Sequence, residues 1–401
     1  MLFLISWRNL WRYPARSFLI MGSVVLGVWA GLFTNAIYFG MGESRKTIAI
    51  LHEVSHLQVH HRAFQDDQAA QYSLSVDSLE RLFQTYPEIA TYSFRTVGSA
   101  MIANASGSRG ITVNGIDPAR EQATRPLKDF LVSGDYLDTD LAQRVYLSTR
   151  LAERMHLEIG NKVVLTMLDT ANNIVAGAFR ICGLFKSENA PFDERNAYLL
   201  KNELDALLGT TGRAHEAAMM LKEEEAIGKV TAGLKASLPD ALVEDWTIIS
   251  PETALVLQSL DQFAIVFILI IMLALAFGII NTMLMAVLER SREIRMLQAI
   301  GMNQTRLFFM VLFETVFLTV AGLLPGLLLA WLSVAWMART GLDLSKIVGE
   351  LMRSFGYGAV IYPYLPARTV VQTVALVFLT ALLSAIFPAM RAIKLRLNPS
   401  S

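Results

Sequence analysis

Residues 289–301 read ERSREIRMLQAIG, a charged stretch that separates two long apolar runs. Charges of both signs alternate along it, while the apolar residues Ile294, Leu297 and Ile300 recur every three residues. This spacing predicts a short amphipathic helix, and Gly301 is suited to end it. We expect this helix to lie at a membrane surface between two spans, either packed on lipid headgroups or presented to a protein partner.

On either side of this stretch, the composition is that of a membrane protein. The 401-residue chain is 53% hydrophobic and 17% charged, whereas soluble domains carry about 25% charged residues. A helix needs about 20 apolar residues to cross the hydrocarbon core of a bilayer. The runs that reach this length, uncharged apart from Glu314, are 17–42, 262–288, 307–338 and 369–390. The single cysteine excludes an intrachain disulfide framework, and the net charge of zero gives no general attraction to nucleic acid.

The first run is too long for the apolar part of a cleaved signal peptide, which has about 7–15 residues. Before it, Arg8 and Arg12 are four residues apart, and so are Trp7 and Trp11. In a helix this spacing gives one basic and one aromatic stripe, which suits a helix lying in the plane of the membrane interface. We therefore predict an uncleaved anchor preceded by an interfacial helix over residues 1–16.

Basic residues at the ends of the runs predict the orientation of the chain, because cytoplasmic loops carry an excess of Lys and Arg. The groups that fall on one side of a four-span protein are Arg8, Arg12 and Arg16; Arg290, Arg292, Arg295 and Arg306; and Arg391, Lys394 and Arg396. We predict that this side is cytoplasmic, with both chain ends there. The loop 339–368 also carries four basic residues, but over a longer stretch.

Residues 43–258 are predicted to form an α+β domain outside the cytoplasm, with one lobe near 110–200 and the other built from the flanking segments. The stretches with the alternation of strands are SHLQVHH (55–61), GITVNGID (110–117) and NKVVLTMLD (161–169). Those with helical spacing are DSLERLFQTYP (77–87) and NELDALLG (202–209).

HEVSH, residues 52–56, matches the H-E-x-x-H pattern in which two histidines bind zinc and a glutamate acts as base. A zinc site of this type needs both histidines on one face of one helix. Here the pattern changes to the period of a strand by His56, and no third ligand presents itself nearby. We therefore interpret His52, Glu53 and His56 as solvated side chains at a helix-to-strand junction, and predict no metal site.

The stretch at 289–301 closely resembles the signature E-R-x-R-E-I-x-x-L-x-A-I-G of the FtsX/MacB-type ABC transporter permeases. The matching residues are Glu289, Arg290, Arg292, Glu293, Ile294, Leu297, Ala299, Ile300 and Gly301. The family's acidic residue early in the third span matches Glu314. Its closing P-A-x-x-A…L-x-P run matches Pro388, Ala389, Ala392, Leu397 and Pro399. RNLWRYPARS near the start resembles the family's opening, and residues 134–165 resemble its periplasmic core domain.

Within that family the chain looks most like the lipoprotein-releasing (LolC/LolE) branch, because one large outer domain follows the first span and VEDW, ending at Trp246, precedes the second. The resemblance implies an α-helical membrane protein with four transmembrane helices and a large α+β periplasmic domain between the first two. The predicted segments are an interfacial helix 1–16, transmembrane helices 17–42, 259–288, 306–338 and 369–390, a periplasmic core domain 43–258, a coupling helix 289–305, a periplasmic loop 339–368 and a cytoplasmic tail 391–401.

By the same resemblance, the permease works in the inner membrane as a dimer with an identical or homologous copy, above two cytoplasmic ATPase subunits. Ile294, Leu297 and Ile300 would anchor the coupling helix in the ATPase, and ATP-driven closure would pass as movement to the outer domain. No G-x-x-x-x-G-K-[ST] motif is present, since Gly228-Lys229-Val230 lacks the hydroxyl that holds Mg²⁺. The chain is thus predicted to be non-catalytic, with ATP and Mg²⁺ bound by the partner.

The predicted cargo is a lipoprotein passed to a periplasmic acceptor; the alternatives are export of peptides or small amphiphiles, and signalling to a cell-wall hydrolase. Apart from Glu314, the spans contain no membrane-buried ion pair and no chain of acids, which disfavours a secondary transporter. Glu314 is expected to have a structural or coupling role, within reach of Arg306 or of the membrane interface. Gly27 and Gly31 form a G-x-x-x-G that packs either across the dimer or within one protomer.

Overall fold

The computed structural model describes residues 14–137 and 141–393, which divide into two compact units. The first unit contains the chain up to Glu43, Gln258–Leu342 and the chain from Val360; the second contains Ser44–Leu257 and Asp343–Ala359. Most of the predicted interfacial helix, including both tryptophans, lies outside the described residues, and so do Leu397 and Pro399 of the closing motif.

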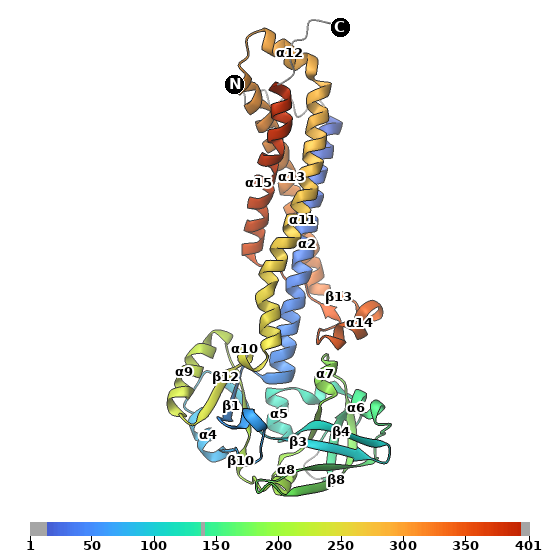
Figure 1. Cartoon of the computed structure of the whole chain (residues 1–401), viewed down its shortest axis with the longest axis vertical. Coiled ribbons are helices and arrows are strands. Elements are labelled where there is room, and N and C mark those ends of the chain that lie inside the picture. Colours follow the sequence, from blue (N-terminus) through green and yellow to red (C-terminus); the bar gives the residue numbers. More distant parts are fainter. Residues whose placement is uncertain (1–13, 138–140, 394–401) are drawn as a thin grey trace. The chain divides into compact units, whose positions relative to one another are not determined.

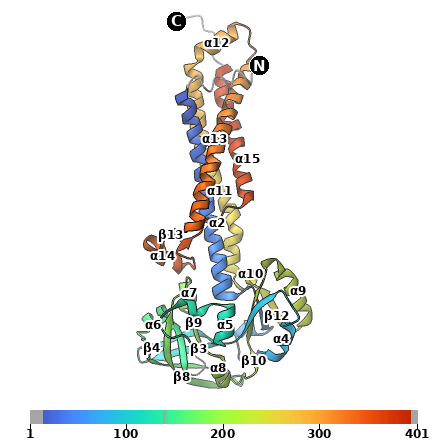
Figure 2. The same ribbon diagram turned by 180° about the vertical axis from the view of Figure 1, so that it is seen from behind.

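Four helices of the described chain are long and apolar enough to cross a membrane, as predicted, and they lie side by side (Figures 1 and 2). They are α2 (Pro14–Ile48), α11 (Pro251–Glu289), α13 (Gln304–Thr340) and α15 (Ala367–Ile393). A short helix, α12 (Ser291–Ala299), connects α11 to α13. Their common core includes Val24, Leu32, Met272, Leu318 and Val377, all less than 4% exposed.

The second unit is built on a mixed ten-stranded sheet with the order β12-β1-β11-β3-β4-β9-β6-β8-β5, in which β7 pairs with β3 and β8. Its strands are β1 (Leu57–His61), β3 (Ile89–Asn104), β4 (Gly107–Ile116), β5 (Leu131–Gly134), β6 (Arg144–Ser148), β7 (Lys162–Leu168), β8 (Ile174–Phe185), β9 (Asn196–Leu200), β11 (Glu216–Leu221) and β12 (Ala241–Asp245). Short strand pairs are β2 (Leu74–Ser75) with β10 (Arg213–Ala214), and β13 (Leu342–Asp343) with β14 (Val360–Ile361).

Short helices complete this unit. They are α3 (Phe64–Asp67), α4 (Val76–Phe83), α5 (Pro118–Thr124), α6 (Thr149–Arg154), α7 (Ala190–Asp193), α8 (Lys201–Leu208), α9 (Ile227–Ser237), α10 (Trp246–Ile249) and α14 (Ser345–Ser354). Single turns are the π-helical η1 (Ala49–Val54) and the 3-10 helices η2 (Leu127–Phe130) and η3 (Glu224–Ala226).

One long strand contributes to two of the hydrophobic cores of this unit. The first half of β3 pairs with β11 and contributes Phe94 to a core shared with Leu79 and Val230. Its second half pairs with β4 and β7 and contributes Ile102 to a second core. The change of partner falls at Arg95, which pairs with β11, and its neighbour pairs with β4. Because the strand is continuous, the two halves of the domain are held in one register.

The segment between α13 and α15 was predicted only as a loop, but it contains α14, which packs within the second unit. Glu350 on α14 pairs with Arg150 at 2.8 Å and with Lys186 at 3.2 Å. Arg353, one turn further, pairs with Glu188 at 3.1 Å. Through these contacts α14, which is distant in sequence from the rest of the second unit, is fastened to the outer domain.

Candidate functional site

The end of α12 has the hydrogen bonds of a Schellman motif. Gly301 has a φ of +98°, which favours glycine, and its N–H donates to the carbonyl of Gln298 at 3.1 Å. The N–H of Met302 donates to the carbonyl of Leu297 at 3.0 Å. Asn303 then accepts a hydrogen bond from the N–H of Thr305 and caps α13. The predicted end of the helix at Gly301 is therefore confirmed, and α12 is fixed at this end by its own backbone.

The two faces of α12 are not divided as the sequence suggested. Ile294 is only 5% exposed and belongs to the core of the four helices, and Leu297 packs against the same core. Ile300 is 77% exposed and Met296 is 57% exposed. Of the three residues predicted to form the apolar anchor for an ATPase, Ile300 alone is presented to the outside, because the other two hold α12 on the membrane helices.

The remaining residues of the signature divide between an exposed face and a face that contacts α13. The exposed stripe, at helical spacing, consists of Glu289, Arg292, Met296, Ala299 and Ile300. On the other side, Arg290 donates to Glu293 at 3.1 Å and to Glu314 of α13 at 3.4 Å. Glu314 is 4% exposed, and among the residues that the structure describes it pairs with Arg290 and not with Arg306. Glu314, the one charged residue within the four apolar runs, therefore forms an ion pair with a residue that lies just outside them.

A second ion pair lies at the opposite end of the same helices. Arg368, at the start of α15, lies 3.4 Å from Asp261 of α11, and both side chains are largely exposed. Between Asp261 and Arg290, α11 carries charge only at Glu289. This interval is about 40 Å along a helix, enough to cross a hydrocarbon core of about 30 Å. The two ion pairs therefore mark the two edges of the membrane-spanning part.

The glycines that allow the closest helix contacts are not the predicted ones. A Cβ on Gly27 or Gly31 would lie 3.5 Å or 3.8 Å from Leu275 or Ile271 of α11, which is ordinary contact within one protomer. On α13, a Cβ on Gly322 would lie 2.9 Å from the carbonyl oxygen of Met21 in α2. A Cβ on Gly326, four residues on, would lie 3.1 Å from Cβ of Val28 in α2. This second G-x-x-x-G was in the sequence, but its spacing alone does not distinguish it from the first.

The HEVSH segment is the end of the helix that begins with α2. His52 and Glu53 lie in η1, and Ser55, with a φ of +64°, ends the helix before β1. The junction itself was predicted correctly, but its side chains are not solvated. Glu53 is 9% exposed and accepts a hydrogen bond from Arg45 at 2.6 Å. Nδ1 of His56 accepts the N–H of Leu221 at 3.0 Å, so both residues hold the junction in place.

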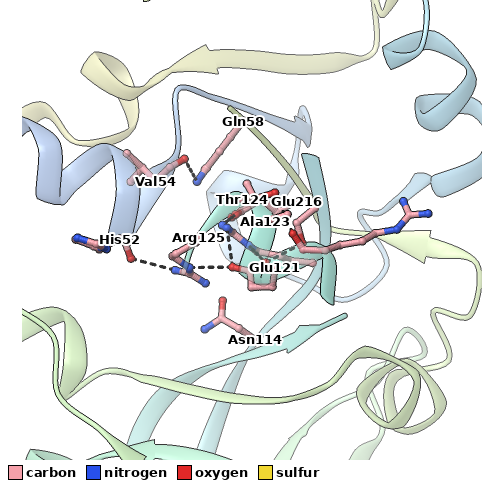
Figure 3. Close-up of polar contacts among 12 residues, drawn as sticks. His52, Val54, Gln58, Asn114, Glu121, Ala123, Thr124, Arg125 and Glu216 are labelled. Atoms are coloured by element: carbon pink, nitrogen blue, oxygen red, sulfur yellow. Dashed lines mark hydrogen bonds and ion pairs between the residues drawn. The ribbon is translucent and has the colours of Figure 1, made fainter. Parts of the chain in front are cut away.

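A buried cluster of charges lies beside this junction (Figure 3). Glu121 of α5 is fully buried and lies 2.9 Å from Arg95 of β3 and 2.8 Å from Arg125. Arg95 also pairs with Glu216 of β11. Arg125 donates to the carbonyl oxygen of His52 at 3.4 Å, as the dashed line in Figure 3 shows. The cluster thus connects the end of η1 to the point where β3 changes partner.

The electrostatics of the cluster keep its members charged. Burial by itself would raise the pKa of Glu121, but Arg95 and Arg125 outweigh it and hold this pKa at about 2. The pKa of His52 falls to about 4, first because of burial and then because of Arg125. The imidazole of His52 packs edge-on against Phe130, with ring centroids 4.5 Å apart. The site is therefore a set of fixed charges beside a neutral histidine, an arrangement suited to holding segments together.

Family models match the membrane part and the outer part separately. The MacB-like periplasmic core domain model matches residues 17–237, and the FtsX-like permease C-terminal model matches residues 265–397. The chain belongs to the permease family that combines these two domains. As a member of this family with four candidate spans, it is a multi-pass membrane protein.

Individual relatives agree with this assignment. The chain is 28% identical over 227 residues to an uncharacterized ABC transporter permease of Methanocaldococcus jannaschii, covering 55% of this chain and 53% of the relative. It is 26% identical over 246 residues to the lipoprotein-releasing system transmembrane protein LolC of Neisseria meningitidis, covering 58% and 59%. The chain therefore matches little more than half the length of these relatives. Among solved structures, the periplasmic region of MacB from Actinobacillus actinomycetemcomitans is similar with a TM-score of 0.36 and 14% identity, over 51% of this chain and 94% of that one.

Proposed function

We propose that the chain is the membrane subunit of an ABC transporter, in which a separate ATPase binds α12 and its movement is passed to the outer domain. The observation that supports this most is the exposed stripe of α12 on a helix whose other face is locked to α11 and α13. A helix attached to the bilayer only by lipid contacts would turn its apolar residues inward, yet Met296 and Ile300 face outward. An exposed apolar pair on a rigid support is suited to a protein partner.

The route from α12 to the outer domain follows the chain itself. Arg290 joins α12 to α13 through Glu314, and α11 runs without interruption from Pro251 to Glu289. α2 continues directly into η1, which contains His52, and the carbonyl of His52 accepts a hydrogen bond from Arg125. A displacement of α12 would therefore reach the outer domain through continuous helices rather than through flexible linkers.

The remaining parts of the proposal follow from this arrangement. The ATPase holds ATP and Mg²⁺, and this chain performs no bond-breaking step. A second copy or homologue completes the permease in the inner membrane, with the stripe of α12 and both chain ends on the cytoplasmic side. The cargo is a lipoprotein drawn from the outer leaflet and passed to a periplasmic acceptor. Its support is one relative, LolC, whose name describes lipoprotein release.

The docking proposal is tested by Ile300→Asp, with Ile347→Asp on α14 as the matched control, because the two isoleucines are 77% and 80% exposed. The full chain is co-expressed with its ATPase and purified in detergent. Loss of an interface anchor costs about 2 kcal/mol, so Ile300→Asp should weaken ATPase binding about 30-fold. Equal ATPase recovery with both variants would contradict the docking assignment.

The cargo is tested separately with the reconstituted complex. A triacylated lipoprotein, its non-acylated form, an unrelated peptide and a single-chain amphiphile are each added, and ATP hydrolysis is measured. Stimulation by the acylated protein alone is the expected result. Stimulation by the peptide or the amphiphile would favour the export alternative, and no response to any of them would favour signalling to a cell-wall hydrolase.

A further inference from the structure

A cavity of about 420 Å³ lies within the first unit, between α2, α13 and the segment that leads into α15. Its walls are aliphatic and aromatic, and include Leu32, Leu327, Trp331, Val334, Leu365 and Val370. The N–H of Tyr364 donates to the carbonyl of Ala36 at 2.9 Å, which fixes one wall to α2. The indole of Trp29 donates to Ser333 at 3.1 Å and fixes α2 to α13. The cavity is therefore formed by packed elements.

The depth of the cavity corresponds to one leaflet of the bilayer. Arg339 is the first charged residue of α13 after Glu314, whose pair with Arg290 marks one edge of the span. The lining residues Leu327 and Ala335 lie 12 and 4 residues before Arg339. Along a helix these separations are about 18 Å and 6 Å. Half of the hydrocarbon core is about 15 Å thick, so the cavity extends over the depth of an outer-leaflet acyl chain.

A cation lies on the same ridge of α13 as the cavity. Leu327, Trp331, Ala335 and Arg339 follow one another at intervals of four residues, which places them on one side of a helix. Arg339 is exposed and makes no ion pair with any residue that the structure describes. Trp336, close by, is 67% exposed, as is typical of aromatic residues at the level of lipid headgroups. The cavity thus has an apolar body and a positively charged outer edge.

We propose that this cavity binds one acyl chain of an anionic phospholipid of the outer leaflet, whose phosphate contacts Arg339. An acyl chain fits the apolar walls and the depth, and a phosphate fits an unpaired guanidinium. The diacylglyceryl group of a lipoprotein has acyl chains but no phosphate, so Arg339 favours the phospholipid over the proposed cargo. The inference does not depend on docking of an ATPase or on the identity of the cargo.

The test uses the full chain reconstituted in phosphatidylcholine vesicles that contain phosphatidylglycerol with a diazirine near the end of one acyl chain. After irradiation, cross-linked peptides are mapped by mass spectrometry, and labelling should concentrate at Leu327–Ala335 and Leu365–Val370. Ala335→Phe fills the cavity, and loss of contact with two methylenes should lower this labelling about tenfold. Leu328→Phe is the control, because Leu328 is 57% exposed and does not line the cavity.

A second variant tests the headgroup contact. Arg339→Gln should lower the preference for labelled phosphatidylglycerol over labelled phosphatidylcholine about fivefold, because one cation near an anionic surface contributes about that much. The proposal is overturned if labels on the unaltered chain spread evenly over Leu324, Leu328 and the cavity, a result that does not depend on whether any variant folds. It is also overturned if an equimolar synthetic triacylated lipopeptide displaces the phospholipid, which would assign the cavity to the cargo.

Discussion

Ion pairs hold two places in the molecule together. One is the joint of Arg290 with Glu293 and Glu314, at one end of the membrane helices, and the other is the cluster around Glu121 in the outer domain. The two places differ in how far their charged side chains are exposed to solvent. Glu121 is fully buried, Arg95 and Arg125 are each 2% exposed, and the side chain of Glu216, at the edge of the cluster, is 13% exposed. The side chain of Arg290 is 12% exposed and that of its partner Glu293 is 33% exposed. In the cluster, four charges come from β3, β11, α5 and the residue after α5. At the joint, three charges among the described residues, Arg290, Glu293 and Glu314, fasten one short helix, whose other face is exposed.

This difference suits two mechanical roles. A closed cluster with balanced charges is costly to open, because each buried ion would lose its partner without gaining water. It therefore favours one arrangement of the two halves of the outer domain and the end of η1. The partly exposed ion pairs of Arg290 keep α12 attached to the membrane helices, while its exposed stripe remains available to a protein partner. Three predictions compare the two places, beginning with the largest expected effect.

Glu121→Gln should destabilise the outer domain strongly. The change removes the negative charge between Arg95 and Arg125 and leaves two buried cations close together. Removing one partner of a buried pair costs about 3–5 kcal/mol, a large share of the roughly 5–15 kcal/mol of a typical domain. We expect a clearly lower thermal midpoint of the full chain in detergent, and rapid tryptic cleavage within residues 89–125.

The matched control for this change is Glu80→Gln, which removes the same charge from a pair with Arg120 at 2.9 Å. The side chains of that pair are 29% and 43% exposed. Exposed pairs contribute about 0–1 kcal/mol, so trypsin resistance should be retained. If Glu121→Gln and Glu80→Gln behaved alike, the buried cluster would not be what holds the outer domain together.

Glu314→Gln should have a smaller effect, because Arg290 keeps its contact with Glu293. The amide of the glutamine can still accept a hydrogen bond from Arg290, but the bond no longer joins two charges. The expected loss in the free energy of unfolding is therefore about 1–3 kcal/mol. A moderate fall in thermal midpoint in detergent is expected. Asp261→Asn, at the exposed pair with Arg368, is the control and should change the midpoint little. A fall as large as that of Glu121→Gln would show that the two places are equally closed.

The sequence predicted the membrane unit well, because long apolar runs and a capping glycine act locally. The four spans and the end of α12 at Gly301 follow from properties of neighbouring residues. The direction in which Ile294 and Ile300 point could not be predicted in the same way. Both are isoleucines on one short helix, and only the position of Leu307 and the rest of the helix core decides which is buried.

The outer domain was predicted element by element, but its charged cluster was missed. Stretches such as LQVHH and KVVLTML are strands, as their alternation indicated. The one sequence signal of the cluster was weak: Glu121 and Arg125 lie four residues apart, and Arg95 interrupts an apolar strand. Arg95 and Glu216 are far apart in the chain and meet only through the pairing of β3 with β11. Such contacts depend on topology, which spacing does not supply.

The last prediction concerns protonation of His52, which leaves every ion pair in place. Its pKa is about 4 in the folded chain against 6.5 for an ordinary histidine, because of burial and then Arg125, although Glu53 and Asp129 oppose the shift. The folded state therefore binds fewer protons than the unfolded state between these values, and stability present above pH 6.5 is lost as the pH falls toward 4. His52→Phe keeps an aromatic ring against Phe130 and should make this loss shallower, as measured by thermal midpoints in detergent at pH 7.5, 6, 5 and 4.5.

The contribution of His52 is obtained from the difference between the pH profiles of the unaltered chain and of His52→Phe, not from either profile alone. Burial also lowers the pKa of His56 and His215, which adds loss of the same sign. Asp193 acts in the opposite direction: burial raises its pKa to about 6, so its protonation below that pH favours the folded state. These groups are unchanged in His52→Phe and cancel in the difference. Midpoints that differ by the same amount at every pH would mean that His52 does not titrate in this window, and that Arg125 and the buried ring do not keep it neutral.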